Sequence, residues 1–261
     1  MEQIKRTAIV TAAAQGMGGA SARRLAAMGM NLSLVDIQED ALEKQAEHCR
    51  NLGVQVITTK ADVTDTVAIA DVVAKTKASF GRIDALLNIA GGAGPRNLHQ
   101  IDEIEPEDWD LVMSLNLRST YLWCKAVMPI MREQEYGRIV NMSSTIARGK
   151  HGPVGTAGAR LAYAAAKAGI LGFTAQLAKD VGQYGITVNA VMPWLTLSDV
   201  NSRVRQRFQA LEPAAREKLL SASPMRRPAE ADEIAAAIAF LASEQASYVS
   251  GIGMPVDGSF L

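Results

Sequence analysis

Two side chains four residues apart, Tyr163 and Lys167 in the stretch YAAAK, could carry out proton transfer. In a helix this spacing places both side chains on one face, with their Cβ atoms about 5–6 Å apart. A free tyrosine has a pKa of about 10 and is a poor base at neutral pH, but a neighbouring ammonium group favours the phenolate and lowers that pKa. The pair therefore predicts a general acid/base that works near neutral pH. The same spacing also occurs by chance on helix surfaces, so other residues must support this interpretation.

A glycine-rich turn, TAAAQGMG over Thr11–Gly18, could bind phosphate. It lies between a short apolar run and an alanine-rich helical pattern, so Gly16, Gly18 and Gly19 fall where free N–H groups at a helix start attract a pyrophosphate. Glycine is needed there because a Cβ would hold the phosphate away from the backbone. Such turns also serve only to pack a helix on a sheet, and Ala12 replaces the usual first glycine.

Asp36 strengthens the nucleotide interpretation. It ends the second predicted strand about 20 residues after the turn, where a carboxylate can accept both ribose hydroxyls of an adenosine. The same charge would repel a 2′-phosphate, and Ile37 and Gln38 offer no cation to pair with one. The expected cofactor is therefore NAD (NAD+/NADH) rather than NADP. A solvated acid at a strand end is the alternative.

Strand-like and helix-like patterns alternate along the whole chain and must position these residues. The predicted strands are Thr7–Thr11, Asn31–Asp36, Val54–Thr58, Ala85–Asn88, Arg138–Met142, Ile186–Val191 and Ile252–Val256. The predicted helices are Met17–Gly29, Glu39–Leu52, Thr66–Phe80, one or two stretches within Pro106–Arg132, Leu161–Tyr184 and Ala229–Ser243. This order predicts an α/β fold: a Rossmann-type, doubly wound, seven-stranded parallel sheet with helices on both faces. We expect a single domain over residues 1–261, with an irregular substrate loop or lid at about 193–211.

Composition narrows the function classes. The chain is 48% hydrophobic and 21% charged with a formal net charge of zero, which argues against a nucleic-acid partner. No apolar run approaches the roughly 20 residues that cross a bilayer, and no signal peptide is recognisable, so we expect a cytoplasmic protein without a membrane partner. Cys49 and Cys124 lie far apart and are expected to be unpaired thiols. The three histidines form no metal-ligand pattern, so no metal is expected.

The order of motifs resembles the short-chain dehydrogenase/reductase family over essentially the whole chain. The residues that carry the resemblance are Thr11 to Gly18, Asp36, ADV at Ala61–Val63, NIAG at Asn88–Gly91, Asn116, SS at Ser143–Ser144, Tyr163 with Lys167, and VDG at Val256–Gly258. Each motif alone is weak, but their combination is specific.

The resemblance implies the roles of the site residues. Tyr163 would be the general acid/base, Lys167 would lower its pKa and bind the nicotinamide ribose, and Ser144, rather than Ser143, would bond the reacting oxygen. Asn116 would hold a water in a proton relay. The implied cofactor-binding residues are Thr11, Gln15, Gly16, Met17, Gly18, Asp36, Asp62, Val63, Asn88, Ala90, Gly91, Tyr163, Lys167, Pro193, Trp194, Leu195 and Thr196. The implied protein is an NAD-dependent oxidoreductase acting on a small-molecule secondary alcohol or ketone, assembled as a homotetramer or homodimer through a helix rich in small residues.

Four features depart from the family pattern: Ala12, Ile89, the Pro193–Trp194 pair where Pro-Gly is usual, and a long stretch between Ser144 and Tyr163. The last two bear on the substrate. Candidate substrate contacts are Ser144, Tyr163, Trp194, Arg148 and His151. Basic loops allow an anionic substrate, but they could also be simply solvated, and Trp194 could be a pocket wall or a packed residue.

Two other functions remain open. A 3-oxoacyl-carrier-protein or acyl-CoA reductase suits the basic loops, but Asp36 disfavours it because that activity usually uses NADPH. A non-catalytic NAD-binding sensor or scaffold belongs to a different class, and the intact Ser144, Tyr163 and Lys167 set argues against it.

Overall fold

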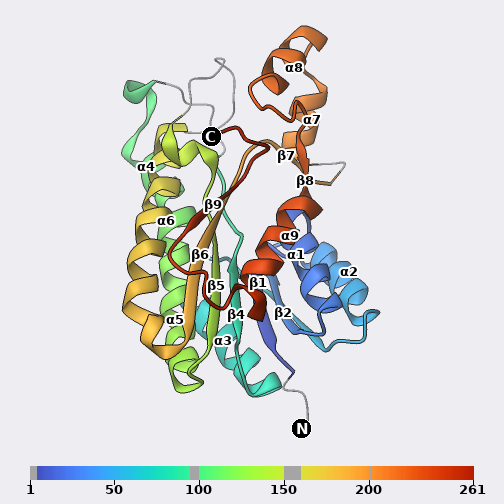
Figure 1. Ribbon diagram of the computed structural model, residues 1–261, viewed down its shortest axis with the longest axis vertical. Helices are drawn as coiled ribbons and strands as arrows, with labels where there is room; N and C mark the ends of the chain where they lie inside the picture. Colours follow the sequence, from blue (N-terminus) through green and yellow to red (C-terminus); the bar gives the residue numbers. More distant parts are fainter. Residues whose placement is uncertain (1–4, 95–99, 150–159, 200–201) are drawn as a thin grey trace.

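Seven parallel strands form the sheet in the computed structural model, which describes residues 5–94, 100–149, 160–199 and 202–261 (Figure 1). The strands are β1 (Thr7–Thr11), β2 (Asn31–Asp36), β3 (Val56–Lys60), β4 (Ala85–Asn88), β5 (Gly137–Met142), β6 (Ile186–Pro193) and β9 (Gly253–Val256). Their order is β3-β2-β1-β4-β5-β6-β9, which confirms the predicted Rossmann-type sheet. The order reverses between β1 and β4, and the carboxyl ends of strands at such a switch point form the usual ligand crevice.

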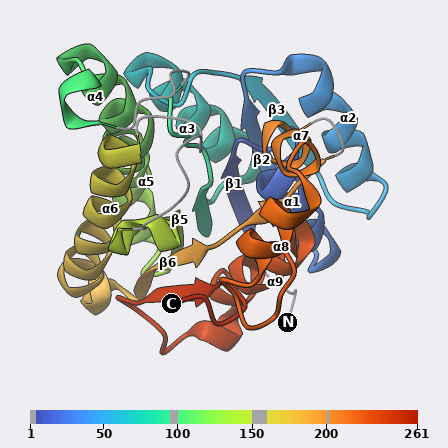
Figure 2. The same ribbon diagram turned by 90° about the horizontal axis from the view of Figure 1, so that it is seen from above.

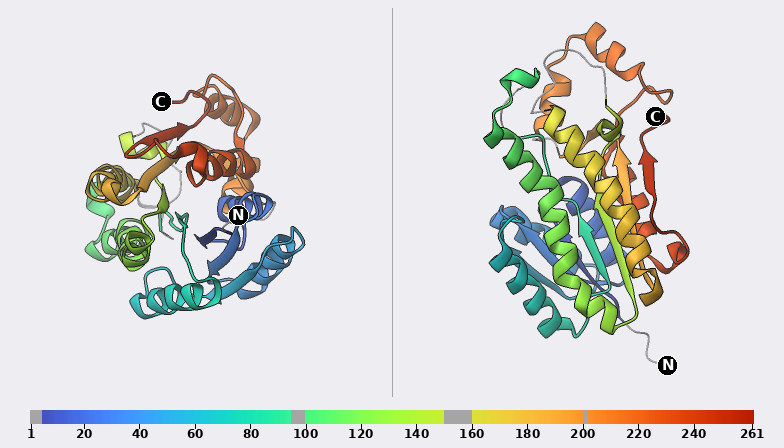
Figure 3. Two further views of the ribbon diagram at one scale, coloured as in Figure 1. Left: turned by 60° about the horizontal axis from the view of Figure 1, so that its bottom comes forward. Right: turned by 90° about the vertical axis from the view of Figure 1, so that its left-hand side faces the viewer.

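Helices cover both faces of the sheet (Figure 3). One apolar cluster joins the sheet to α1 (Gly16–Ala27), α2 (Glu39–Arg50) and α9 (Ala231–Leu241). The other joins it to α3 (Thr66–Phe80), α5 (Ser119–Glu133) and α6 (Arg160–Val181). Because side chains alternate along a strand, Val10 of β1 enters the first cluster and Ile9 the second. Both faces are therefore buried, as the continuous apolar strands require.

The predicted helix Thr66–Phe80 has the predicted bounds because both of its ends carry strong signals. Asp65 Oδ1 accepts hydrogen bonds from the N–H groups of Val67 (2.8 Å) and Ala68 (3.2 Å). Gly81 ends the helix in the left-handed conformation, with φ of +74°. Local capping signals thus mark both ends of this helix.

The sequence predicted irregular structure over residues 193–211, and this was wrong because part of the stretch is regular. It contains β7 (Thr196–Leu197), which pairs with β8 (Ala229–Glu230), and helix α7 (Arg203–Gln209), and α8 (Pro213–Leu220) follows. The Ser202 hydroxyl caps α7 by accepting from Arg205 N–H (3.3 Å). These short helices carry too little apolar periodicity to be recognised in sequence. They lie above the carboxyl ends of the strands (Figures 1 and 2).

The structure also divides the long segment before β5. Helix α4 (Pro106–Met113) runs through a π-helical turn (Ser114–Arg118) into α5. Among the described residues, no helix is both long and apolar enough to cross a membrane.

Candidate functional site

The glycine-rich turn has the left-handed backbone that favours glycine, both at Gly16 and at Ala12, which replaces the usual first glycine. Ala12 adopts φ of +52° and Gly16 φ of +59°, both in the left-handed region. A Cβ added to Gly18 would lie 2.0 Å from the Ala12 carbonyl oxygen, so no other residue fits there. Glycine at position 18 therefore lets the first turn of α1 pack directly against the backbone of Thr11 and Ala12.

Ala12 occupies a conformation that penalises a side chain, so Ala12→Gly should stabilise the protein. Relief of the left-handed strain is worth about 1 kcal/mol after the extra entropy of the unfolded glycine is subtracted. NAD affinity should change only a few-fold, because residue 12 shapes the tight turn, and Gly16 to Gly18, which are expected to contact the phosphates, stay unchanged. Thermal unfolding and NADH titration measure both effects. Ala13→Gly, at a buried position without a positive φ, is the control and should destabilise. A hundredfold change in NAD affinity would mean that residue 12 has another role.

A cavity of about 390 Å³ opens beside this turn at the switch point. Its lining residues are Ala12, Gln15, Gly16, Met17, Gly18, Asp36, Ile37, Gln38, Ala61, Asp62, Val63, Ile89, Ala90, Gly91, Leu115, Thr196, Ser198 and Val204. Most of the predicted cofactor-binding residues therefore meet in one place. The side chain of Asp36 is 7% exposed, and its two oxygens accept from Ala14 N–H (3.0 Å) and Gln38 N–H (3.0 Å).

Thr11 and Asn88 are not among the residues that line the cavity. The Thr11 hydroxyl donates to the Leu87 carbonyl (3.1 Å) and accepts from Ile89 N–H (2.9 Å), which joins the ends of β1 and β4. Asn88 Nδ2 donates to Asn141 Oδ1 (2.9 Å) inside the sheet. Both side chains brace the strand ends that carry the site.

One acidic residue in this region was missed by the sequence analysis. Asp199 Oδ2 accepts from Gly16 N–H at 2.6 Å, so a carboxylate sits on an N–H group at the start of α1. Arg205 holds the same segment by donating to the Ser198 carbonyl (2.7 Å) and to Glu230 Oε2 (2.7 Å). The start of α1 is the place where an anionic ligand gains most from the helix dipole. No local sequence pattern indicates this contact, because it depends on the path of the chain after β7.

Asp199→Asn should therefore raise affinity for NADH. The negative carboxylate competes with a pyrophosphate for the helix start, and its removal should tighten binding about three- to tenfold. Fluorescence titration of NADH at low salt measures the change. Glu217→Gln on the exposed side of α8 is the matched control and should leave the affinity unchanged. Weaker binding by the Asp199 variant would contradict this role.

Helix α6 carries the predicted acid/base pair to the same edge of the sheet. Lys167 Nζ donates to the Met142 carbonyl (2.7 Å) and lies 5.4 Å from the centre of the Tyr163 ring. The Ser143 hydroxyl donates to the Lys167 carbonyl (2.8 Å) and is buried, so it fixes α6 against β5. Ser144 is only half-buried and hydrogen-bonds to Tyr163. This geometry favours Ser144 over Ser143 as the residue available to a substrate.

Burial changes the proton chemistry expected from the sequence. It raises the pKa of Tyr163 to about 12, although the hydrogen bond between Tyr163 and Ser144 acts in the opposite direction. Burial also lowers the pKa of Lys167 to about 7. The lowered tyrosine pKa that the spacing predicted is therefore absent from this structure, because burial raises the pKa of Tyr163 by more than its hydrogen bond with Ser144 lowers it. In the protein alone, the Tyr163 hydroxyl is a protonated donor.

The buried Lys167 should make stability depend on pH. Its pKa falls from 10.5 in the unfolded chain to about 7 in the folded protein, so the unfolded chain binds more protons between these values. The free energy of unfolding should rise with pH through this window, by up to about 1.4 kcal/mol per unit, and the gain should disappear as pH falls to 7. Lys167→Met should flatten that rise in urea denaturation curves between pH 7 and about 9.5. Lys125→Met, at an exposed position on α5, should keep it, and equal slopes in the two variants would contradict the assignment.

Asn116 lies in the π-helical turn, fully buried beside the pair. Its Nδ2 donates to the Gly92 carbonyl (2.8 Å) and to the Val112 carbonyl (2.8 Å), while its Oδ1 accepts from Gly92 N–H (3.1 Å). A Cβ on Gly91 would come within 2.5 Å of Asn116 Oδ1 and 3.1 Å of Lys167 Nζ. The absence of a side chain at Gly91 thus lets Asn116 and Lys167 border one small space.

The remaining predicted residues are more scattered. The Pro193 carbonyl accepts from the Ser144 hydroxyl (3.4 Å). Trp194 and Leu195 line a second cavity, of about 550 Å³, and are not in the lining of the first. Arg148 is exposed at the end of the 3₁₀ turn that follows Ser144, and His151 lies outside the described residues.

Known proteins resemble the chain over nearly its whole length. The family model described as Enoyl-(Acyl carrier protein) reductase matches residues 11–260. Levodione reductase of Leifsonia aquatica is 38% identical over 258 residues, covering 97% of this chain and 93% of the relative. The 3-oxoacyl-acyl-carrier-protein reductase FabG of Escherichia coli is 35% identical over 253 residues, covering 97% and 96%.

Solved structures with a similar fold also match nearly the whole chain. A crystal structure of levodione reductase has a TM-score of 0.86 with 36% identity, covering 97% of this chain and 96% of that chain. YwfH, an NADPH-dependent reductase involved in bacilysin biosynthesis, has a TM-score of 0.88 with 27% identity, covering 98% of both chains.

Proposed function

Because the chain belongs to the short-chain dehydrogenase/reductase family, we propose that it is an NAD-dependent oxidoreductase for a secondary alcohol or ketone. The observation that carries this proposal is the meeting of Ser144, Tyr163 and Lys167 at the switch-point edge that also holds the cavity of the glycine turn and Asp36. The cavity supports the proposal of a bound dinucleotide because the glycine turn at the start of α1 and Asp36 both line it. A bound nicotinamide would supply or accept the hydride.

The proposed proton chemistry uses this chain's own residues. In ketone reduction, the Ser144 and Tyr163 hydroxyls donate hydrogen bonds to the carbonyl oxygen, and Tyr163 transfers its proton to that oxygen. In alcohol oxidation, the same proton returns to Tyr163. Lys167 stabilises the tyrosinate that forms in reduction, since protonated Lys167 is favoured once a negative charge appears beside it. Asn116, which borders the same space, is proposed to hold the water that exchanges this proton with solvent.

We propose NAD rather than NADP because Asp36 lies in the cavity lining at the end of β2. A carboxylate accepts ribose hydroxyls well and repels a 2′-phosphate. YwfH is NADPH-dependent, so the shared fold does not by itself select NAD, and the proposal of NAD rests on Asp36.

A second candidate activity is reduction of a 3-oxoacyl thioester, because FabG is among the relatives. Steady-state assays with acetoacetyl-CoA and NADH or NADPH distinguish it from the main proposal. Preference for the thioester with NADPH would favour the second candidate.

We also propose a cytoplasmic homotetramer (or homodimer), with Asp110, Met113, Leu117, Tyr121, Gly169 and Phe173 at one of the contacts between subunits. These residues line an open groove between α4, α5 and α6, where Tyr121 is 45% exposed. Sedimentation velocity measures the assembly state.

The test of the main proposal is formation of NADH when purified protein meets NAD and a panel of diols, sugars, cyclic alcohols and hydroxy acids. We expect turnover of a secondary alcohol with NAD. Strong preference for NADP, or cofactor binding without turnover on any substrate, would reject it.

A further inference from the structure

A lysine lies beside the acidic residue that is proposed to select NAD. The residues directly after Asp36 in the sequence offer no cation, but in the register of the sheet Asp36 at the end of β2 pairs with Lys60 at the end of β3. Neighbouring strands are about 4.8 Å apart, and directly paired residues of parallel strands project to the same face of the sheet. Lys60 therefore leaves the sheet on the same side as Asp36, which is the side of α2 (Figure 2).

The ion pair made by Lys60 shows where its side chain points. Lys60 Nζ donates to Glu39 Oε2 at 3.2 Å, and Glu39 is the first residue of α2. Ala61, the residue after Lys60, lines the cavity of about 390 Å³ together with Asp36. The ammonium group of Lys60 thus lies between the start of α2 and the end of the cavity that Asp36 lines.

The lining of this cavity offers no cation to an anionic ligand. Among the described residues that line it, Asp36 and Asp62 carry charge, and none is a lysine or an arginine. A 2′-phosphate on a ribose beside Asp36 would therefore depend on a cation from outside the lining. The four-carbon side chain of Lys60 is longer than the spacing between the two strands, so its ammonium group can reach such a phosphate.

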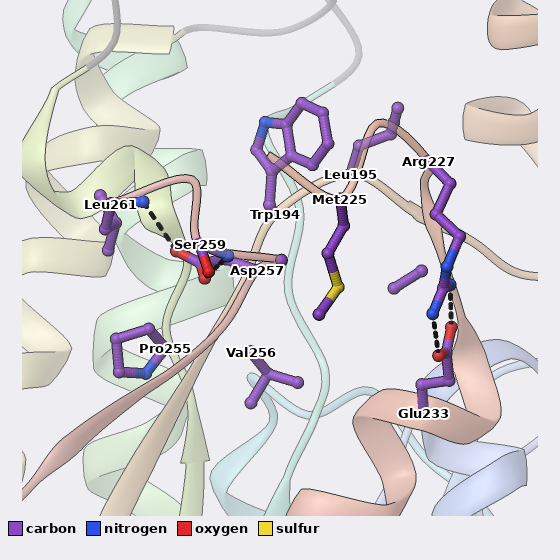
Figure 4. Close-up of a pocket in the computed structure, with 12 residues that line it drawn as sticks. Trp194, Leu195, Met225, Arg227, Glu233, Pro255, Val256, Asp257, Ser259 and Leu261 are labelled. Atoms are coloured by element: carbon purple, nitrogen blue, oxygen red, sulfur yellow. Dashed lines mark hydrogen bonds and ion pairs between the residues drawn. The ribbon is translucent and has the colours of Figure 1, made fainter. Parts of the chain in front are cut away.

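The contact between Lys60 and Glu39 is easily exchanged. The two side chains are 61% and 68% exposed, and a single ion pair in water contributes little to stability. By contrast, Arg227 donates to both oxygens of Glu233, at 2.6 and 2.7 Å, in the cavity of Figure 4. A phosphate carries more negative charge than one carboxylate and attracts an ammonium group more strongly. Glu39 therefore neutralises Lys60 without locking it in place.

We propose that Lys60 is a second determinant of the choice between NAD and NADP, and that Glu39 is a positioning residue that acts through it. While the ion pair is formed, the negative charge of Asp36 dominates beside the ribose and favours NAD. Once Lys60 is released, its ammonium group binds the 2′-phosphate of NADP as a point charge. This inference rests on the proposed function, because it concerns the cofactor of that same site.

The role of Lys60 is tested in the Asp36→Asn protein, where the repulsion of a 2′-phosphate has been removed. Fluorescence titrations at low salt give the Kd of NADPH and of NADH. Lys60→Met should weaken NADPH binding about five- to tenfold and leave the Kd of NADH within about twofold. Lys44→Met removes the same charge from an exposed position further along α2 and should leave the ratio of the two Kd values unchanged. An unchanged ratio with Lys60→Met, or an equal change in both variants, would overturn the proposal.

A second substitution tests whether Glu39 acts through Lys60. In the Asp36→Asn protein, Glu39→Gln should tighten NADPH binding about three- to fivefold, because it releases the ammonium group. This gain should disappear in the protein that also carries Lys60→Met. A gain that persists there would assign the effect to the charge of Glu39 itself and reject its positioning role.

Titration of the wild type separates this inference from the proposed function. Tighter binding of NADPH than of NADH by the wild type would reject the proposed NAD dependence. The effect of Lys60→Met on the ratio of the two Kd values would still decide whether Lys60 binds the 2′-phosphate.

Discussion

Tyr163→Phe should reduce hydride transfer roughly a thousandfold while leaving NADH affinity nearly unchanged. The substitution removes only the hydroxyl that Ser144 contacts, and the ring stays beside Lys167. Without that hydroxyl, the group proposed to give its proton to the developing alkoxide in ketone reduction is missing. Pre-steady-state mixing of enzyme, NADH and ketone isolates this step from product release.

Tyr248→Phe is the matched control, because that side chain is fully exposed, and it should keep full activity. A Tyr163→Phe protein with full activity would place the proton donor elsewhere. Loss of NADH binding together with activity would show that Tyr163 acts through the shape of the cofactor site instead.

Asp36→Asn should shift the preference from NAD toward NADP by roughly a hundredfold in the ratio of kcat/KM values. The variant keeps an oxygen acceptor but loses the charge, which weakens the ribose contacts and removes repulsion of a 2′-phosphate. It also preserves nearly the same volume at a position that is 7% exposed. Steady-state kinetics with both cofactors and one alcohol measure the ratio.

Asp62→Asn is the appropriate comparison, because Asp62 also lines the cavity and its carboxylate accepts from Thr64 N–H (2.8 Å). It should affect both cofactors alike, since no 2′-phosphate is expected beside it. If the two variants change the ratio equally, general charge in the cavity rather than Asp36 determines the choice.

The sequence predicted the fold well where local and tertiary signals agree. Thr66–Phe80 has a side-chain cap at one end and a glycine at the other, so its bounds matched. The third strand was predicted two residues early, at Val54–Thr58, because Val54 and Val56 are both buried and the pattern alone did not set the register. Pairing of Leu32 with Val56 and of Asp36 with Lys60 sets it in the protein.

Site residues that lie close together on one helix could be predicted from their spacing in the sequence. Tyr163 and Lys167 share a turn of α6, and their proximity followed from that. Their pKa values did not follow, because burial depends on the surrounding fold and is the largest cause of both shifts. The Asp199 contact and the pairing of Asp36 with Lys60 join segments distant in sequence, so no local pattern could indicate them.

The π-helical turn at Ser114–Arg118 joins α4 to α5 and sets the directions in which the side chains of α5 point relative to those of α4. An α-helix advances about 100° per residue, so one additional residue within a turn rotates all later side chains relative to earlier ones. Before the turn, Val112 of α4 packs in a cluster with Ala162 and Tyr163, and after it, Trp123 of α5 packs into the core of the sheet. The π-helical turn therefore lets α4 direct Val112 toward Tyr163 while α5, which continues from it, directs Trp123 into the core of the sheet.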